Sequence, residues 1–396
     1  MLPATHKAIV IGAGPGGLAA VKSLLDSGVN KICWIDRKFG GGRLNELYRE
    51  ISSNTKVKIY LDAVTSSPTC QRIIENTPKP NAITALERYD REATCQLSVA
   101  GDMVKMLEKG LLRHKGVEKV VDYVKEARLE GSTWKVGLFN SSSSPISASR
   151  LFLCTGSHPI IPSFHKPYNA DLEVLDLDKC MVKSSLPSLF PQDRKSVVGV
   201  IGNSHSGVLA VRNLFEIHNE GKRDLKIMNF RRSDIQYAIY REDGIVNDNT
   251  GLKGDTADWS KIYMEDQPNG QTKGDKGETV IEQIDISKNE KEIYGKRLKE
   301  CTHLIYAIGY QPNPYPTLFV DGKEIKQDDL EFDQDTSEFS LNGQKVRGLY
   351  GLGIAHPEKT EDPEGKVESA VGLAKFFAFG DKNKDRWAKD VQHRSR

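Results

Sequence analysis

Two glycine-rich segments of this chain have the spacing of a dinucleotide-binding turn. They are Gly12-Ala13-Gly14-Pro15-Gly16-Gly17 and Gly202-Asn203-Ser204-His205-Ser206-Gly207. In such turns the first glycine permits the tight turn, the second lets the backbone approach a pyrophosphate, and the last lets a helix pack closely on a strand. Two such turns in one chain predict a protein that brings two redox nucleotides together.

The residues around the first turn complete a βαβ unit. Residues 8–11 are apolar and β-branched, which predicts a buried strand, and residues 18–25 are typical of a helix. A second strand over 31–35 ends at Asp36, which follows Gly12 by 24 positions. We expect the helix N-terminus to face phosphates and Asp36 to bind ribose hydroxyls. A glycine-rich turn in an unrelated α/β domain is the alternative interpretation.

A second run of glycines, Gly40-Gly41-Gly42, follows Asp36 and lies between two arginines, Arg37 and Arg43. The glycines let the chain pass close to a cofactor, and the arginines can bind phosphate. The candidate cofactor-binding residues in this part of the chain are Gly12, Gly14, Pro15, Gly16, Gly17, Asp36, Arg37, Arg43 and Leu44.

The second turn lies in a similar unit, with strands over 196–201 and 225–230 and a helix over 208–215. Ser204 replaces the middle glycine and is small enough to admit phosphate. The second strand ends at Arg231-Arg232 instead of an acid, and arginine suits a 2′-phosphate. NADPH is therefore favoured over NADH, although either arginine could be a solvated surface charge. The candidates here are Gly202, Asn203, Ser204, Ser206, Gly207, Arg231 and Arg232.

The beginning of the chain resembles the FAD-binding half of two-dinucleotide-binding-domain flavoproteins. Gly41-Gly42, then Tyr48 and Ser53-Asn54-Thr55-Lys56, resemble class B flavin monooxygenases, with Leu44 near the position where an aromatic residue is expected. The second turn is similar to the NADPH site of flavin-containing monooxygenases. The resemblance implies FAD and NADPH as cofactors, which carry most of the chemistry.

Later segments extend this resemblance to about residue 379. Residues 150–159 resemble the element that closes the FAD domain and include Thr155 and Gly156, while residues 303–313 resemble its counterpart after the NADPH domain and include Gly309 and Tyr310. In the wider flavoprotein group an aspartate follows the position of Gly353, and here none does. This difference argues against disulfide and thioredoxin reductases. We expect the last helix over 367–379.

The resemblance predicts an α/β fold with two Rossmann-like dinucleotide-binding domains. The FAD domain would comprise residues 1–165 and 301–396, with the NADPH domain, residues 166–300, inserted between them. Residues 242–280 form a helix-containing excursion in the NADPH domain that either covers the active site or decorates the surface. Ser141–Ser144 are predicted to form a hairpin loop between strands over 134–139 and 146–154.

Composition excludes several other functions. The chain has 396 residues, a net charge of +2 and six scattered cysteines without a CxxC pair. These features argue against nucleic acid as a partner, a redox dithiol or a zinc site, so no metal is expected. No apolar run is long enough to span a membrane, and Met1–His6 leave no room for a signal peptide. We expect a cytoplasmic protein; its oligomeric state is left open.

Two residues are candidates for the chemistry itself. The resemblance places Asn54 near the reactive edge of the flavin, although it could be an ordinary turn residue. His356, beside the expected flavin-contacting loop, could act as an acid or base at neutral pH, although a partly exposed turn residue is the more common case for such a histidine. Ser206 and Tyr310 are candidates to hold the nicotinamide nucleotide, and Tyr310 could instead serve packing.

Three functions fit these residues. The leading hypothesis is an NADPH-dependent flavin monooxygenase that uses O2 to oxygenate a nitrogen, a sulfur or a ketone of a small soluble molecule. A second enzyme would pass electrons to a quinone or a protein acceptor. The third is a flavin-binding sensor without turnover, suggested by Ser204, Ile308 and the missing aspartate.

Overall fold

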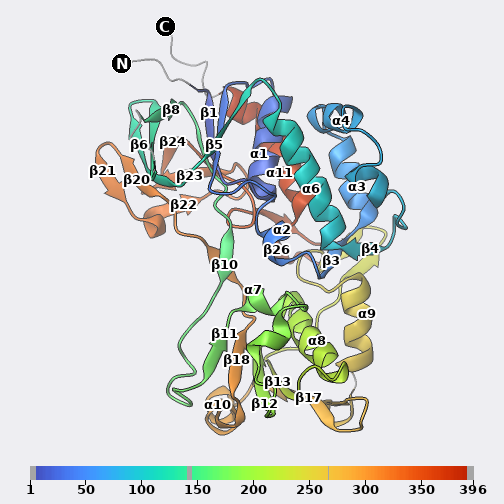
Figure 1. Cartoon of the computed structure of the whole chain (residues 1–396). Coiled ribbons are helices and arrows are strands. Elements are labelled where there is room, and N and C mark those ends of the chain that lie inside the picture. Colours follow the sequence, from blue (N-terminus) through green and yellow to red (C-terminus); the bar gives the residue numbers. More distant parts are fainter. Residues whose placement is uncertain (1–5, 141–144, 266, 390–396) are drawn as a thin grey trace.

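The chain forms two lobes, each built on its own β-sheet (Figure 1). This computed structural model describes residues 6–140, 145–265 and 267–389. The first sheet has the strand order β22-β23-β24-β9-β1-β2-β5, and the second has the order β11-β18-β12-β13-β17-β16. We call the lobe around the first sheet the first domain and the other lobe the second domain. The predicted α/β fold with two Rossmann-like domains is confirmed.

The first sheet is parallel in its central part because βαβ crossovers connect its strands. Its parallel strands are β1 (Ala8–Ile11), β2 (Ile32–Asp36), β5 (Val117–Val121), β9 (Leu151–Leu153) and β24 (Gln344–Gly351). The antiparallel edge consists of β23 (Glu338–Leu341) and β22 (Leu330–Phe332).

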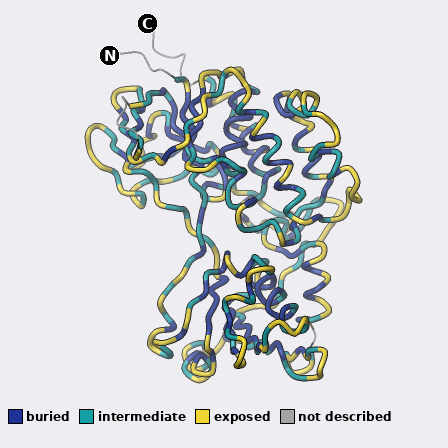
Figure 2. The backbone as a smooth tube through the Cα atoms, viewed as in Figure 1, coloured by how far each residue is buried: buried dark blue, intermediate teal, exposed yellow. Residues whose placement is uncertain are grey.

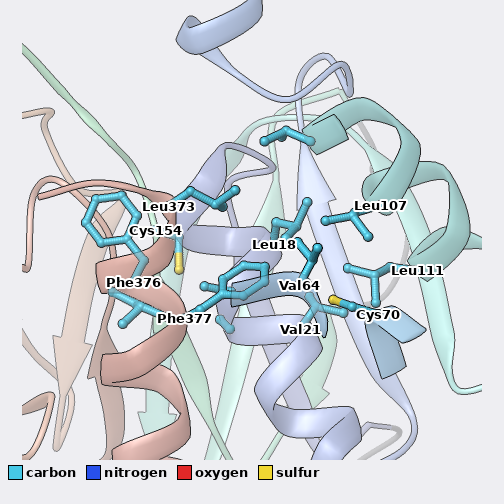
Figure 3. Packing of buried hydrophobic residues seen from close by; sticks show 14 of the residues in the cluster. Leu18, Val21, Val64, Cys70, Leu107, Leu111, Cys154, Leu373, Phe376 and Phe377 are labelled. Carbon is cyan, nitrogen blue, oxygen red and sulfur yellow. The ribbon is translucent and has the colours of Figure 1, made fainter. Parts of the chain in front are cut away.

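Helices cover one face of this sheet and a smaller sheet covers the other. Helices α1 (Pro15–Asp26), α6 (Leu97–Leu112) and α11 (Leu373–Lys389) bury Leu18, Leu107 and Phe377 in one core (Figure 3). On the opposite face, Ile9 of β1 packs with Trp134 of the small sheet. That sheet contains β21 (Lys323–Ile325), β20 (Thr317–Val320), β6 (Val124–Glu130), β7 (Thr133–Leu138) and β8 (Ile146–Ala148).

The remaining elements of the first domain lie along the sequence between β2 and β5 and near the C-terminal end. They are α2 (Arg43–Leu47), β3 (Ser52–Lys56), α3 (Val57–Thr65), α4 (Pro68–Glu75), α5 (Ala82–Leu86), β4 (Thr94–Gln96), β25 (Glu358–Glu361) and β26 (Val367–Ala370). In Figure 2 the buried backbone of this lobe follows the central strands and the helices packed on them.

The second domain repeats this plan at smaller scale. Its parallel strands are β11 (Glu173–Leu175), β12 (Ser196–Ile201), β13 (Leu225–Arg231), β17 (Thr279–Asp285) and β18 (His303–Tyr306), with β16 (Gln271–Lys273) antiparallel at the edge. Its helices and hairpin are α7 (Leu177–Cys180), α8 (His205–Asn219), α9 (Gly254–Tyr263), α10 (Glu290–Arg297) and the pair β14 (Ile239–Arg241) and β15 (Gly244–Val246).

The chain crosses between the domains twice, and the two crossings pair with each other. Strands β10 (Ser157–Pro159) and β19 (Tyr310–Pro312) form an antiparallel ribbon between the lobes (Figure 1). Strand β18 belongs to the second sheet, so the chain returns to the first domain only after Tyr306. The expected domain boundary lies at residue 301.

Two expected elements differ from the structure. The segment 146–154 is divided into β8 and β9, because the chain leaves the small sheet and enters the main one at Arg150. The helix expected over 367–379 was wrong at its start: residues 367–370 form β26, which pairs with β25, and α11 begins only after Gly372. Ser141–Ser144 lie outside the described residues.

The excursion over 242–280 reaches the first domain. Helix α9 packs against β3, and Arg241, the residue just before the excursion, forms an ion pair with Glu364 in the turn between β25 and β26. This segment therefore joins the two domains. Within the described part of the chain, we find no helix long and apolar enough to cross a membrane.

Candidate functional site

The two glycine-rich turns have the same geometry. A Cβ atom on Gly12 would lie 2.2 Å from the carbonyl oxygen of Cys154, and one on Gly202 would lie 2.3 Å from that of Ala307. Their φ angles are +106° and +112°, in the region that only glycine adopts readily. In each domain the backbone of the turn therefore lies directly against the end of the neighbouring strand.

The last glycine of each turn allows the helix to pack on the strand. A Cβ atom on Gly17 would lie 1.8 Å from the carbonyl oxygen of Gly12, and one on Gly207 would lie 2.4 Å from that of Gly202. Helix α1 starts with Pro15 at its first position. Both helices lack a side-chain N-cap hydrogen bond, and neither has an acidic residue in its first turn. Free amide groups and the positive dipole end therefore suit a phosphate at both positions.

Three loops of the first domain, which contain Gly14, Gly42 and Gly353, are in direct backbone-to-backbone contact. A Cβ atom on Gly42 would lie 2.7 Å from the Cα atom of Gly14, and one on Gly16 would lie 2.7 Å from the Cα atom of Gly353. Any side chain at these positions would fill the space beside the turn. The glycines thus form a cradle of the kind that a dinucleotide needs.

Glu108 holds the loop of Gly40-Gly41-Gly42 in place. Glu108 lies on α6 and is only 4% exposed. Its Oε2 atom accepts hydrogen bonds from the backbone amides of Gly40 (3.0 Å) and Gly41 (2.8 Å). Burial raises the pKa of Glu108, and the two amide bonds oppose that shift. Sequence reasoning missed this residue, although it lies on the apolar face of the helix, between Val104 and Leu111.

The side chain of Asp36 binds a backbone amide of the first turn. Its carboxylate accepts hydrogen bonds from the amides of Ala13 (2.6 Å) and Lys38 (2.7 Å), and burial raises its pKa while these bonds lower it. Beyond the end of β2 lies a cavity of about 860 Å³. It is lined by Arg37, Lys38, Phe39, Gly40, Asn45, Glu46, Lys105 and Tyr123. Arg37 thus lies where it could meet a bound group, whereas Leu44 packs against the core.

In the second domain the loop after β13 lies beside the turn. Asn203 donates a hydrogen bond to the carbonyl oxygen of Ser233 (2.6 Å). Arg231 pairs with Asp234 (2.5 Å) and Arg232 with Glu290 (2.6 Å), and the side chain of Arg232 is 68% exposed. The Nε atom of Arg231 is buried without a hydrogen-bond partner. Both arginines therefore lie near the turn, where they could exchange these partners for a phosphate.

Asn313 binds the backbone of Thr155 and Gly156, just before the chain first crosses to the second domain. Its side chain donates to the carbonyl oxygen of Thr155 (2.7 Å), and its amide donates to that of Gly156 (2.9 Å). The hydroxyl of Thr155 is buried without a partner. Gly309, with φ of +115°, precedes β19 in the other crossing. The unpartnered hydroxyl next to the glycine cradle fits a bound group.

Arg43 points toward the second domain. It forms an ion pair with Asp178 of α7, whose other oxygen accepts hydrogen bonds from the hydroxyls of Tyr48 (2.6 Å) and Tyr310 (3.0 Å). The expected contact of Arg43 with phosphate stays a prediction. Sequence reasoning missed Asp178, because nothing in its local sequence distinguishes it from other helical acids.

Asn54 joins β3 to the excursion of the second domain. Its amide group donates to the carbonyl oxygen of Gly251 (3.0 Å), and its carbonyl oxygen accepts from the amide of Lys253 (2.8 Å). Asn54 is thus more than an ordinary turn residue: both polar atoms of its side chain orient another segment. Its contact with a flavin stays a prediction.

His356 is a packing residue in this structure. It is 2% exposed, and its ring contacts the rings of Phe332, Phe339 and Tyr315, whose hydroxyl lies 3.3 Å from Nε2. Burial lowers the pKa of His356 to about 3. The ring is therefore neutral and shielded from solvent at neutral pH, and its predicted acid–base role stays a prediction.

His356 makes the stability pH-dependent. Its pKa is about 3 in the folded chain and about 6.5 in the unfolded chain, so the unfolded state binds more protons between these values. Its contribution to the free energy of unfolding is complete above the unfolded pKa and is lost as the pH falls. The free energy of unfolding, measured with urea at a series of pH values between about 3 and 6.5, should depend less steeply on pH in His356→Gln than in wild type. The difference in slope should reach up to about 1.4 kcal/mol per pH unit.

An unchanged slope in His356→Gln would contradict this assignment. Some slope should persist in the variant, because burial also lowers the pKa of His205, to about 4. Full turnover in the same variant would remove the proposed acid–base role.

Comparison with known proteins places these features in a family. No protein-family model matches the chain. The chain is 36% identical to Monooxygenase AgnR1 of Paecilomyces divaricatus over 393 residues, which cover 97% of this chain and 98% of that protein.

Solved structures share the fold at low sequence identity. Ornithine N-hydroxylase of Kutzneria sp. 744 is similar with a TM-score of 0.60 and 14% identity, covering 97% of this chain and 99% of that one. Flavin-containing monooxygenase of Stenotrophomonas maltophilia gives 0.57 and 13%, covering 98% and 99%. Thioredoxin reductase of Lactococcus lactis gives 0.52 and 14%, with the same coverage.

The close relative distinguishes between the functions that the sequence left open. Reductases and monooxygenases share this fold, so fold alone does not separate them. The identity to a named monooxygenase over nearly the whole length of both chains separates the two functions. It favours oxygenation of a substrate over electron transfer to another acceptor. With its two Rossmann-like domains and their paired glycine-rich turns, the chain belongs to the monooxygenase family that includes Monooxygenase AgnR1.

Proposed function

We propose that this monooxygenase binds FAD in the first domain and NADPH in the second, and adds one oxygen atom from O2 to a small soluble substrate. The substrate would offer a nucleophilic nitrogen or sulfur, or a ketone. The observation that carries the proposal is the full-length relationship to Monooxygenase AgnR1. The matching geometry of the two turns supports two dinucleotides in one chain. We further propose the cytoplasm as its compartment.

The residues proposed for each cofactor come from the loops at the carboxyl ends of the parallel strands, where ligands of such sheets bind. For FAD they are Gly12, Gly14, Pro15, Gly16, Gly17, Asp36, Arg37, Arg43, Leu44, Thr155, Gly156 and Gly353. For NADPH they are Gly202, Asn203, Ser204, Ser206, Gly207, Arg231, Arg232, Gly309 and Tyr310.

The protein's own part in the reaction is to bind and to orient. Bound together, the two cofactors would supply electron transfer and oxygen activation. The amides at the start of α1 and α8 would hold the diphosphates, and Asp36 fixes the first turn through the amide of Ala13. Asn54 holds residues 251–253 against the first domain and would exclude water at that side of the site.

Oxygen labelling tests the proposed function directly. The purified protein with FAD and NADPH would be given an amine, a thioether and a ketone under ¹⁸O2, and the products examined by mass spectrometry. One ¹⁸O atom per product molecule is expected from at least one class. NADPH consumption with no labelled product from any class, together with quinone reduction, would contradict the proposal.

Glu108 should control FAD binding as a hydrogen-bond acceptor. Glu108→Leu leaves two buried amides without a partner, which costs about 1–3 kcal/mol each, so the Kd for FAD should rise about tenfold or more. Glu108→Gln keeps an acceptor oxygen and should stay within about threefold of wild type. Fluorescence titration with FAD measures both, and equal weakening in the two variants would show that the charge matters instead.

Arg231 and Arg232 should select NADPH. Replacing both with Gln removes charge-assisted hydrogen bonds to the 2′-phosphate, so the KM for NADPH should rise about tenfold or more while that for NADH stays unchanged. Lys195→Gln, at the opposite end of β12, is the matched control. Equal kcat/KM values for NADPH and NADH in the wild-type enzyme would contradict the role of these arginines in selecting NADPH.

A further inference from the structure

One buried carboxylate lies where the two domains meet. Asp178 belongs to α7, which packs against α8 of the second domain. Its side chain is only 2% exposed. A carboxylate removed from water in this way needs donors for its charge, and unpaired it would be costly.

None of the three side chains that bind this carboxylate comes from the sheet or helices of its own domain. Arg43 and Tyr48 lie at the start and just past the end of α2 in the first domain, and Tyr310 lies in β19 of the ribbon between the lobes. The two hydroxyls bind Oδ1 at 2.6 and 3.0 Å, and the guanidinium pairs with Oδ2. Asp178 is thus held by the first domain and by the crossing at once.

These partners connect the carboxylate to both proposed nucleotide sites. Arg43 directly follows Gly42 of the cradle in the first domain. The hydroxyl of Tyr310 also interacts with Ser206 of the turn in the second domain, and burial raises the pKa of Tyr310, which keeps that hydroxyl protonated. Asp178 is thus linked, through one residue on each side, to the cradle of the first domain and to the turn of the second.

The physical character of the contact suits positioning. Two hydroxyl hydrogen bonds and a guanidinium around one buried carboxylate favour a single arrangement of the three partners, because hydrogen bonds are directional. Such buried ion pairs contribute little net stability, and their best attested role is to specify one register among alternatives. Hydride transfer between two bound rings depends steeply on their separation and angle.

We propose that Asp178 is a positioning residue that sets the second domain on the first, so that the nicotinamide and the flavin meet in a reactive geometry. The proposal rests on the proposed function, because it assumes both cofactors. Its specific consequence is that loss of the carboxylate slows flavin reduction without weakening the binding of either nucleotide.

Anaerobic stopped-flow reduction by NADPH tests this in the FAD-loaded enzyme. For Asp178→Asn the limiting rate of flavin reduction should fall by about tenfold or more, since small misplacements cost up to about 100-fold. The Kd values for FAD and NADPH should stay within about threefold of wild type, a change below 1 kcal/mol. Asp171→Asn, an exposed acid of the same domain, is the control and should match wild type.

A wild-type limiting rate in Asp178→Asn would overturn the proposal. If that variant does not fold, Tyr48→Phe serves instead, since it keeps the charge pair and removes the shorter of the two hydroxyl hydrogen bonds, 2.6 Å. It should also be reduced more slowly, and an unchanged rate there would equally overturn the proposal. Failure of NADPH to reduce the wild-type flavin would contradict the proposed function itself.

Discussion

The close contact of backbone with backbone at the two turns is the constraint on which the rest of this structure depends. At Gly12 and Gly202 the turn touches a carbonyl oxygen of the next strand, and at Gly17 and Gly207 the helix touches the turn itself. These contacts leave no room for a single methyl group. They aim the N-termini of α1 and α8 at the carboxyl edges of the two sheets, where phosphates are bound.

Polar contacts join the two domains at several points, beside the apolar packing of Ile51 in the core of the second domain. Asp178 binds Arg43, Tyr48 and Tyr310, and the side chain of Asn54 binds the backbone of the excursion. Farther along, Asp248 pairs with Lys375, and Glu368 accepts from the amide of Asn249 (2.8 Å). Directional contacts of this kind specify a relative orientation, which an enzyme that brings two cofactors together requires.

The protein's own ionisable groups are suited to structure more than to acid–base chemistry. His205 and His356 are held neutral by burial, and every one of the six cysteines is buried. Burial raises the pKa of Cys33 and Cys180 to about 12, so these thiols are not nucleophiles at neutral pH. Chemistry carried by cofactors, with the protein binding and orienting them, fits this inventory.

Sequence alone determined the features that depend on neighbours along the chain. The glycine spacing, the strand–turn–helix order of both units and the position of Asp36 are local patterns, and each has its expected place in the structure. Tertiary structure decided what depends on distant residues. Arg43 meets Asp178, Glu108 supports a loop 67 residues away, and residues 367–370 form a strand because β25 is there to pair with them. His356 likewise is a buried packing residue because Phe332 and Phe339 surround it. A local pattern can say which side chains are present, but only the folded chain determines which partners, charges and solvent each one meets.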